Sequence, residues 1–441
     1  MKRRSELDTY RDEIVRSLIE TYSTDGKGTK ITGLESLLTH MKNKNILTYE
    51  LMKREGFEKQ FDRARYWFPS SDTPLTDITI NSILPQLKTE SHDSFEDCKT
   101  LFQDKLKGVW KEPVQNYDLF FILDVRPDSK FTTFSVKIEN IDIDVQLINK
   151  TEEPLSLPSF ASKKASLENQ IGKKYDDEKI ISLHLLIPAR NHYYAIKEGI
   201  QYVHFILGWI GFINNYHSGK ILTSGFPHSY DNCPSPTFLL VGNHQKECVD
   251  VLAWKYEIIQ NSCPVSSDLI KSICSHYSNG TAQARKIMFE AMNAYYTGLH
   301  EDNRGYALLA FWAALERLCL MHEGLSHDKM LNRLFNLIRH PSNSNEYELT
   351  MLLALRNDAI HNWRYDSIGS YERDLMKNYT ELLIDFYLIH LMSLNLNEIE
   401  LFYTKFHCTA KELEEHEVSD KKVFDLIKKL REKPKSAKVI S

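Results

Sequence analysis

The C-terminal part of the chain repeats apolar residues at helical spacing. They recur every three or four positions, which is the pattern of helices with one buried face. Glycine, proline and short polar runs interrupt the pattern and mark the joins between helices. The sequence therefore predicts a bundle of five helices with short loops, at residues 282–299, 303–323, 327–340, 346–363 and 370–394.

The N-terminal part mixes helical and strand patterns. Two runs with helical spacing come first, and Thr32 and Glu35 are placed as a capping box at the start of the second. Short runs that alternate in polarity, or are rich in β-branched and aromatic residues, follow them. We expect helices at 8–23, 33–57 and 193–216, a β-hairpin of 119–125 with 131–138, strands at 141–147, 180–187 and 237–241, and a long polar loop at 149–179.

These patterns predict an α+β fold, in which a mixed helix and strand region precedes an all-α helical bundle. The second helix of the bundle is apolar almost all round, so we expect it to lie at the centre. We expect four parts: a mainly helical region at 1–115, an α+β sensor or specificity domain at 116–262, the helical bundle at 266–395, and a helical basic tail at 396–441.

The composition is that of an ordinary globular protein. The chain has 441 residues, of which 42% are hydrophobic and 26% charged, and it is long enough for two or three domains. No apolar run approaches the length of a membrane span, and the charged N-terminus lacks the apolar core of a signal peptide. The seven cysteines are scattered without a Cys-x-x-Cys pair, which favours reduced thiols. We expect a cytoplasmic protein that does not contact a membrane.

One charged residue, Arg356, interrupts the apolar face of the fourth predicted bundle helix, where an unpaired guanidinium is costly to bury. The apolar face consists of Leu349, Leu352, Leu353, Ile360 and Trp363. Asn357 follows the arginine directly, and His361 lies five positions after it. Arg317 and His322 have the same spacing inside an apolar run, so the spacing alone is not distinctive. The added polar residue and the helical context make the first motif the better candidate.

An arginine and a histidine are the groups that RNA cleavage without a metal requires. The imidazole of His361 can take the proton of a ribose 2′-hydroxyl, and the guanidinium of Arg356 can stabilise the charge of the phosphorane that forms. Five helical residues turn through about 500°, which leaves these two side chains about 140° apart on one helix. Asn357 lies one turn before His361 and can reach it. Two copies of the helix across a two-fold axis would bring both pairs together.

Two acidic residues are candidates to support the motif. Glu316 is the conspicuous charge on the apolar second helix of the bundle, and a buried glutamate needs a cationic partner, for which Arg356 is our candidate. The alternative is that Glu316 lies at the helix edge in a surface salt bridge with Arg317 or another cation. Asp358, one turn before His361, is placed to tune the histidine.

The run Arg356-Asn357-Asp358-Ala359-Ile360-His361 resembles the R-x4-H motif of the HEPN superfamily, whose ribonucleases often carry a polar residue after the arginine. The upstream segment at 310–318 is similar to the long apolar helix with an internal Leu-Glu pair in ApeA-like HEPN proteins. The resemblance extends over about residues 280–395.

This resemblance implies a homodimer with a composite site, in which Arg356, Asn357 and His361 are catalytic and Glu316 and Asp358 support them. It implies metal-independent cleavage of RNA that leaves a 2′,3′-cyclic phosphate and a 5′-hydroxyl, with no cofactor. Many relatives are toxins or antiviral effectors. We assign the N-terminal region by default to sensing or restraint, with a phage or cellular trigger as the expected signal. The alternative is a non-catalytic HEPN module that binds nucleic acid, a nucleotide or a partner protein, with Arg356 and His361 as a structural pair.

Basic residues gather at the end of the chain, where residues 421–441 carry eight basic and two acidic side chains. Lys428, Lys429 and Arg431 are candidates for contact with RNA. The alternative is a solvated helix end followed by a free terminus.

The remaining polar patterns do not predict a metal site. Cys319, His322 and His327 lack a fourth ligand for zinc. Asp142 and Asp144 alternate with apolar residues, as on the solvated face of a strand.

Overall fold

The structure is a computed structural model. The residues that it describes are 113–123, 132–148, 157–171, 180–189, 192–216, 233–253, 266–319, 326–337, 343–362, 364–406, 408 and 421–432. The chain divides into two compact units, Met1–Tyr117 with Pro188–Glu198 and Asp118–Ile187 with Gly199–Ser441. The second unit contains most of the described helices and strands.

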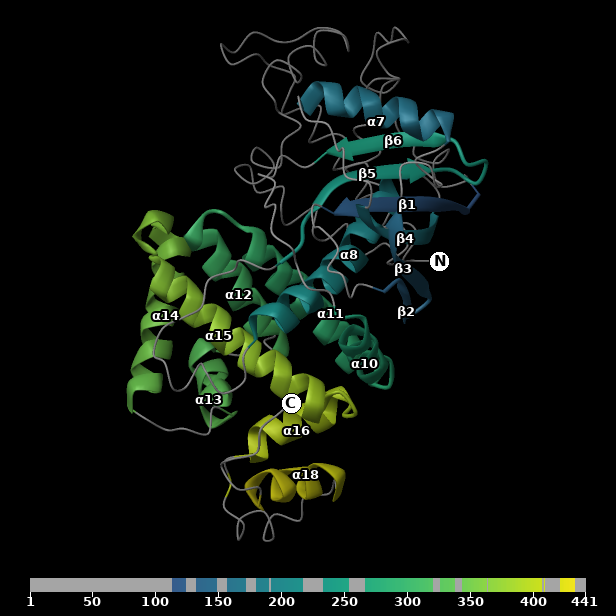
Figure 1. Cartoon of the computed structure of the whole chain (residues 1–441). Coiled ribbons are helices and arrows are strands. Elements are labelled where there is room, and N and C mark those ends of the chain that lie inside the picture. Colours follow the sequence, from purple (N-terminus) through teal and green to yellow (C-terminus); the bar gives the residue numbers. More distant parts are fainter. Residues whose placement is uncertain are drawn as a thin grey trace, which may run out of the picture. The chain divides into compact units, whose positions relative to one another are not determined.

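A six-stranded sheet is followed in sequence by a helical region, which confirms the α+β class (Figure 1). The strand order is β2-β3-β4-β1-β5-β6, and the pairs β2–β3, β3–β4, β1–β5 and β5–β6 are antiparallel. The strands are β1 Gln115–Leu123, β2 Phe134–Ile138, β3 Ile141–Ile148, β4 Ile180–Ala189, β5 Pro236–Gly242 and β6 Cys248–Ala253.

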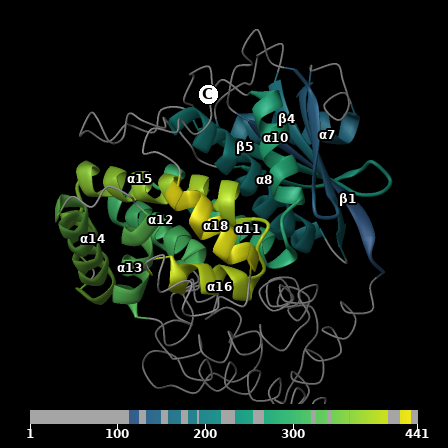
Figure 2. The ribbon, with the colours of Figure 1, turned by 90° about the horizontal axis from the view of Figure 1, so that it is seen from below.

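Alternate side chains of β1 pack against two helices, which lie on opposite faces of the sheet. Leu119 and Phe121 face α8 (His192–Asn215), whose Gly199 lies so near that a Cβ there would be 2.2 Å from Leu119 Cδ1. Phe120 faces the other way and meets Phe160 of α7 (Pro158–Ile171) edge-on, with ring centroids 6.0 Å apart. Figure 2 shows the two helices on opposite sides of the sheet. Residues on both faces of β1 are therefore buried, as expected of an interior strand.

Two expectations for the sheet region were wrong, and one strand was missed. β1 does not form a hairpin with β2, because β1 lies between β4 and β5 while β2 pairs with β3. The expected loop at 149–179 contains α7, which begins at Pro158 and buries Phe160 against the sheet. Proline suits the first position of a helix, where its missing N–H is not needed. The strand β6 was not anticipated.

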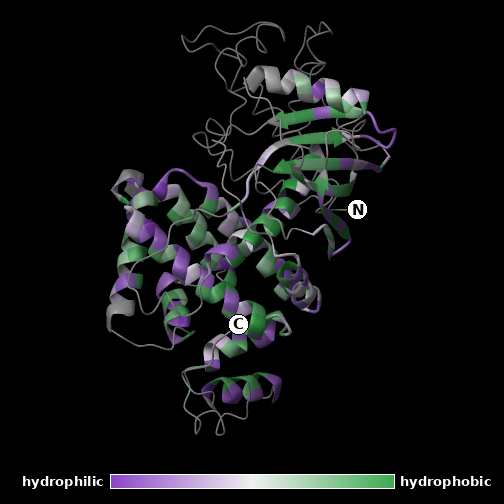
Figure 3. Cartoon of the chain, in the orientation of Figure 1, coloured by the Kyte–Doolittle hydropathy of each residue, from purple (hydrophilic) through white to green (hydrophobic). Residues whose placement is uncertain are grey.

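The helical region follows the predicted order closely. Its helices are α10 Ser267–Ser278, α11 Ala282–His300, α12 Arg304–Leu318, α13 His327–Leu337, α14 Asn343–Asn362, η1 Tyr365–Ser367, α15 Ser370–Phe386, η2 Tyr387–Leu391, α16 Leu396–Lys405 and α18 Lys421–Glu432. α12 packs against α11, α14, α15 and η1, which confirms its central place. In Figure 3 the strands are mostly hydrophobic, whereas α14 and α18 mix hydrophilic and hydrophobic residues.

Some boundaries differ from expectation. The α-helical part of α15 ends at Phe386, and a π-helical turn, η2, continues it. The helices expected at 8–23 and 33–57, with the capping box of Thr32 and Glu35, lie outside the described residues.

In the described part of the chain, no single helix is long and apolar enough to cross a membrane. One pair, Ser370–Leu391 with Leu396–Lys405, reaches that length and composition only when both are taken together, and it bends by 116° between them.

Candidate functional site

The motif arginine lies on the buried face of α14. Leu349, Leu352 and Ala359 are buried, and Arg356 continues their spacing of three and four residues. Its side chain is 17% exposed. The predicted position of Arg356 within the apolar face is thus confirmed, although Ile360, expected on the same face, is exposed. Trp363 lies outside the described residues.

Glu316 of α12 is the partner of this arginine, as the sequence led us to expect. Its Oε1 atom lies 3.4 Å from Arg356 NH2. The same oxygen accepts a hydrogen bond of 2.7 Å from Trp312 Nε1 and lies 3.2 Å from His327 Nε2. The alternative pairing with Arg317 does not occur, because Arg317 reaches Glu290 instead, at 3.3 Å.

The guanidinium of Arg356 is held by further contacts. Its NH1 atom donates to Asn357 Oδ1 at 3.1 Å, and its charge lies 6.0 Å from the centre of the Trp312 ring, within range of a cation–π attraction. Its Nε atom is buried and has no hydrogen-bond partner within the described residues. The side chain is therefore positioned by α12 and α14 while part of its donor capacity is unused.

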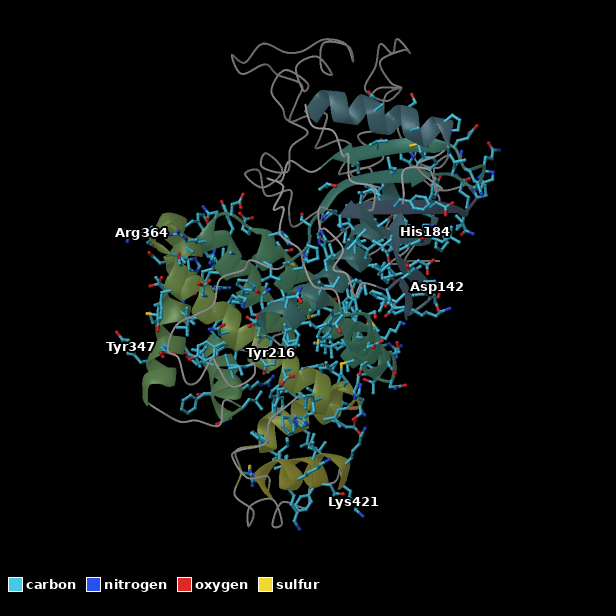
Figure 4. All side chains as sticks on the ribbon, in the orientation of Figure 1. Asp142, His184, Tyr216, Tyr347, Arg364 and Lys421 are labelled. Atoms are coloured by element: carbon cyan, nitrogen blue, oxygen red, sulfur yellow. The ribbon has the colours of Figure 1, made fainter. Side chains whose placement is uncertain are left out.

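The structure does not bring His361 to Arg356 within one chain. His361 is exposed in the last turn of α14, and no described residue forms a hydrogen bond or ion pair with it. Asn357 contacts Arg356 rather than the histidine, which corrects our expectation. Asp358 forms an ion pair with Arg364 at 3.8 Å. Figure 4 shows Arg364 just beyond the end of α14 that carries His361, and Tyr347 toward the helix's other end.

Two residues of this cluster were missed by the sequence analysis as members of the site. Trp312 precedes Glu316 by four residues, so its place one turn away on the same helix was readable from the sequence. His327 gives no such signal, because it belongs to α13 and reaches Glu316 only through packing of the helices. We call Trp312, Glu316, His327, Arg356 and Asn357 the α12–α14 cluster.

A second ionic cluster lies on α15 and is sealed in the core. Lys377 Nζ and Glu381 Oε1 are 2.8 Å apart, and both side chains are 0% exposed. Tyr295 donates its hydroxyl to the same glutamate oxygen at 2.5 Å. One turn further along, Asp385 accepts a hydrogen bond of 3.2 Å from the hydroxyl of Tyr216. Burial raises the pKa of Asp385 to about 6, against the effect of that hydrogen bond.

The basic residues of α18 divide into two kinds. Lys428 and Lys429 are exposed, and they are available to a nucleic acid. Arg431 instead donates to the backbone oxygens of Phe406, at 2.6 Å, and Cys408. Its guanidinium therefore ties α18 to the end of α16. The residues after 432 lie outside the described part.

No described group of three or more His, Cys, Asp or Glu side chains is arranged to hold a metal ion. Burial raises the pKa of the Cys319 thiol to about 12, which opposes the thiolate form that zinc binds. His322 lies outside the described residues. On the sheet, Asp142 and Asp144 are both solvated as expected, and Asp144 also accepts a hydrogen bond from Ser135 at 2.5 Å.

Comparison of the chain with models of protein families, with curated proteins and with solved structures found no match.

Proposed function

We propose that the helical region is a HEPN-like bundle and that the protein is a metal-independent endoribonuclease that works as a homodimer. The observation that carries the proposal is the placement of the motif on α14. Arg356 is held at the buried face by Glu316 and Asn357, whereas His361 is exposed five residues later on the same helix. A positioned guanidinium and an accessible imidazole are the two groups that this chemistry needs.

In the proposed reaction His361 takes the proton of a ribose 2′-hydroxyl, which then attacks the adjacent phosphorus. The bond to the 5′-oxygen of the next nucleotide breaks, and that oxygen takes a proton from water. Arg356 stabilises the added charge of the phosphorane, and Asn357 orients the guanidinium through its amide oxygen. The products carry a 2′,3′-cyclic phosphate and a 5′-hydroxyl.

The site is proposed to form between two copies of the chain. On one helix Arg356 and His361 lie about 140° apart, so they cannot reach one phosphate together. An isologous contact of two α14 helices would set the arginine of one protomer against the histidine of the other. Lys428 and Lys429 would guide RNA by charge alone, since basic side chains that contact phosphates add affinity without sequence choice.

The HEPN resemblance also suggests a biological setting. We propose a cytoplasmic toxin-like or antiphage effector whose N-terminal region responds to a phage or cellular trigger. A non-catalytic HEPN binding module is the second candidate, and one observation favours it: the guanidinium of Arg356 is already engaged by Glu316 and Asn357.

The first test incubates the purified protein with total cellular RNA in EDTA and maps new ends for 2′,3′-cyclic phosphate. We expect cleavage by wild type and a loss of about 10²–10⁴-fold in His361→Ala, the usual value of a general acid or base. Arg356→Ala should lose cleavage as well. His276→Ala is the matched control, because His276 is also exposed on a helix. Full activity of His361→Ala would contradict the mechanism, and RNA binding without cleavage by wild type would favour the binding module.

The second test asks whether the site lies between protomers. Arg356→Ala and His361→Ala are mixed, unfolded together and refolded, so that half of the dimers carry one of each. Each such dimer has one intact pair, and activity should return to about a quarter of the wild-type value. The control is a mixture of Arg317→Ala with His361→Ala. Arg317 lies outside the proposed site, because it pairs with Glu290. No recovery in the first mixture would place the pair in one chain.

A further inference from the structure

Three hydrogen-bond donors meet at a single oxygen in the α12–α14 cluster. Trp312 Nε1, His327 Nε2 and Arg356 NH2 lie 2.7, 3.2 and 3.4 Å from Glu316 Oε1. The histidine donates when its Nε2 atom carries the proton. Glu316 Oε2 has no hydrogen-bond partner within the described residues. All three donors thus converge on one oxygen of the carboxylate, Glu316 Oε1.

These donors come from three different helices. Trp312 belongs to α12, His327 is the first residue of α13, and Arg356 lies on α14. The rings of Trp312 and His327 have centroids 6.0 Å apart, and the guanidinium lies at the same distance from the indole ring. Helix packing therefore holds an indole, an imidazole and a guanidinium around one position. Such a set of fixed donors is suited to an anionic oxygen.

The three donors hold the carboxylate of Glu316 at unequal distances. The contact from Trp312 is short, whereas the contact from Arg356 is the longest of the three and is at the limit of a hydrogen bond. Arg356 also keeps NH1 on Asn357, and its Nε atom is unused within the described residues. Glu316 is 27% exposed, so its carboxylate can leave the donors toward solvent without an unfolding of the helix.

We propose that Trp312, His327 and Arg356 form a phosphate-binding pocket, and that Glu316 occupies it as an internal competitor. An RNA phosphodiester enters by displacing the carboxylate, and Trp312 and His327 then help Arg356 to hold the phosphate oxygens. Glu316 thereby restrains the site until a substrate takes its place. The identity of the anion as an RNA phosphodiester rests on the proposed function, whereas the anion pocket itself does not.

The test measures binding of inorganic phosphate by isothermal titration calorimetry on the full chain. Glu316→Ala should bind phosphate about 10–100-fold more tightly than wild type, which is the range expected when one charged competitor is removed. Glu290→Ala is the matched control, since it removes the same charge from the neighbouring pair with Arg317. The gain should vanish in Glu316→Ala with Arg356→Ala, and shrink in Glu316→Ala with His327→Ala.

A second variant guards against misfolding. Glu316→Gln keeps the shape and removes the charge, so it should show a smaller gain that still depends on Arg356. The proposal is overturned if neither variant gains affinity over wild type, or if Glu290→Ala gains as much. It is also overturned if the gain survives loss of both Arg356 and His327.

RNA cleavage by the same variants separates this inference from the proposed function. If both hold, Glu316→Ala lowers the KM for RNA, and Glu290→Ala does not. Tight phosphate binding by Glu316→Ala with no cleavage by any variant or wild type would retain the pocket and refute the nuclease. Cleavage by wild type with no gain in phosphate affinity would retain the nuclease and refute the pocket.

Discussion

The helical region contains two ionic clusters that each pair a glutamate with a cationic side chain but differ in their exposure to water. On α15, Lys377 and Glu381 belong to one helix, are 0% exposed and lie 2.8 Å apart. In the α12–α14 cluster, Glu316 and Arg356 belong to different helices, are 27% and 17% exposed, and lie 3.4 Å apart. The first pair is closed to any ligand. The second is within reach of an anion from solvent, and this accessibility marks it as the candidate site.

The two ion pairs differ in their exposure to water, and this exposure decides how strongly each charge depends on its partner. A charge that is fully removed from water depends on its partner, because desolvation is repaid only by the ion pair and its hydrogen bonds. A partly exposed charge keeps some hydration, so its partner can be exchanged at low cost. Three predictions test this contrast, from the largest expected effect to the smallest, and a fourth concerns the exposed lysines of α18.

Removal of Lys377 from the buried cluster on α15 should cause the largest loss of stability. Lys377→Met leaves Glu381 buried without its cation, and we expect a loss of about 3–5 kcal/mol in the free energy of unfolding, measured by urea titration. The double variant with Glu381→Leu should recover most of this loss, because neither charge of the pair is then left in the core. A loss below about 1 kcal/mol in the single variant would mean that water reaches the pair.

Asp385 should make the stability depend on pH. Its pKa is raised from 3.8 to about 6 in the folded protein, so the folded state favours the proton. Its stabilising contribution is complete below pH 3.8 and is lost as the pH rises through 6. Asp385→Asn keeps an acceptor for Tyr216 and should raise the stability at pH 7 by up to about 3 kcal/mol.

Urea titrations of both proteins between pH 5 and 8 check this prediction, with their difference expected to shrink toward pH 5. A constant difference across that range would assign the effect to packing instead of titration.

Glu316→Gln should change the stability far less than Lys377→Met does. Since the pair of Glu316 with Arg356 is partly exposed, we expect a loss of at most about 1 kcal/mol in the same urea titration. A loss as large as that of Lys377→Met would show that the α12–α14 cluster is a structural element of the core. The contrast between the two clusters would then fail.

The exposed lysines of α18 should affect binding alone. Lys428→Gln with Lys429→Gln leaves the buried Val423, Ile427 and Leu430 in place, so the melting temperature should not move. The dependence of RNA affinity on salt should become shallower, by about one to two units of the logarithmic slope. Arg431→Gln should instead lower the melting temperature, because it loses the hydrogen bonds to the backbone oxygens of Phe406 and Cys408. An unchanged slope would exclude the lysines from the RNA contact.

Much of the helical region could be read from the sequence, because a helix is a local structure whose buried face repeats every three or four residues. Arg356 was placed correctly on the buried face, and its pairing with Glu316 followed from the cost of an unpaired buried charge. The sheet was harder. Strand pairing joins distant segments, and nothing in residues 119–138 shows that β1 pairs with β5 rather than β2.

The amino-acid sequence by itself determined the five helices between residues 282 and 394, the charged residue on the face of α14 and the impossibility of joining Arg356 to His361 on one helix. These depend on the helical period and on the cost of burying charge, which act within a few residues. Only the tertiary structure decided that His327 joins Glu316 and that Arg431 ties α18 to α16. Such contacts depend on how helices far apart in sequence pack, and side-chain patterns do not encode that packing locally.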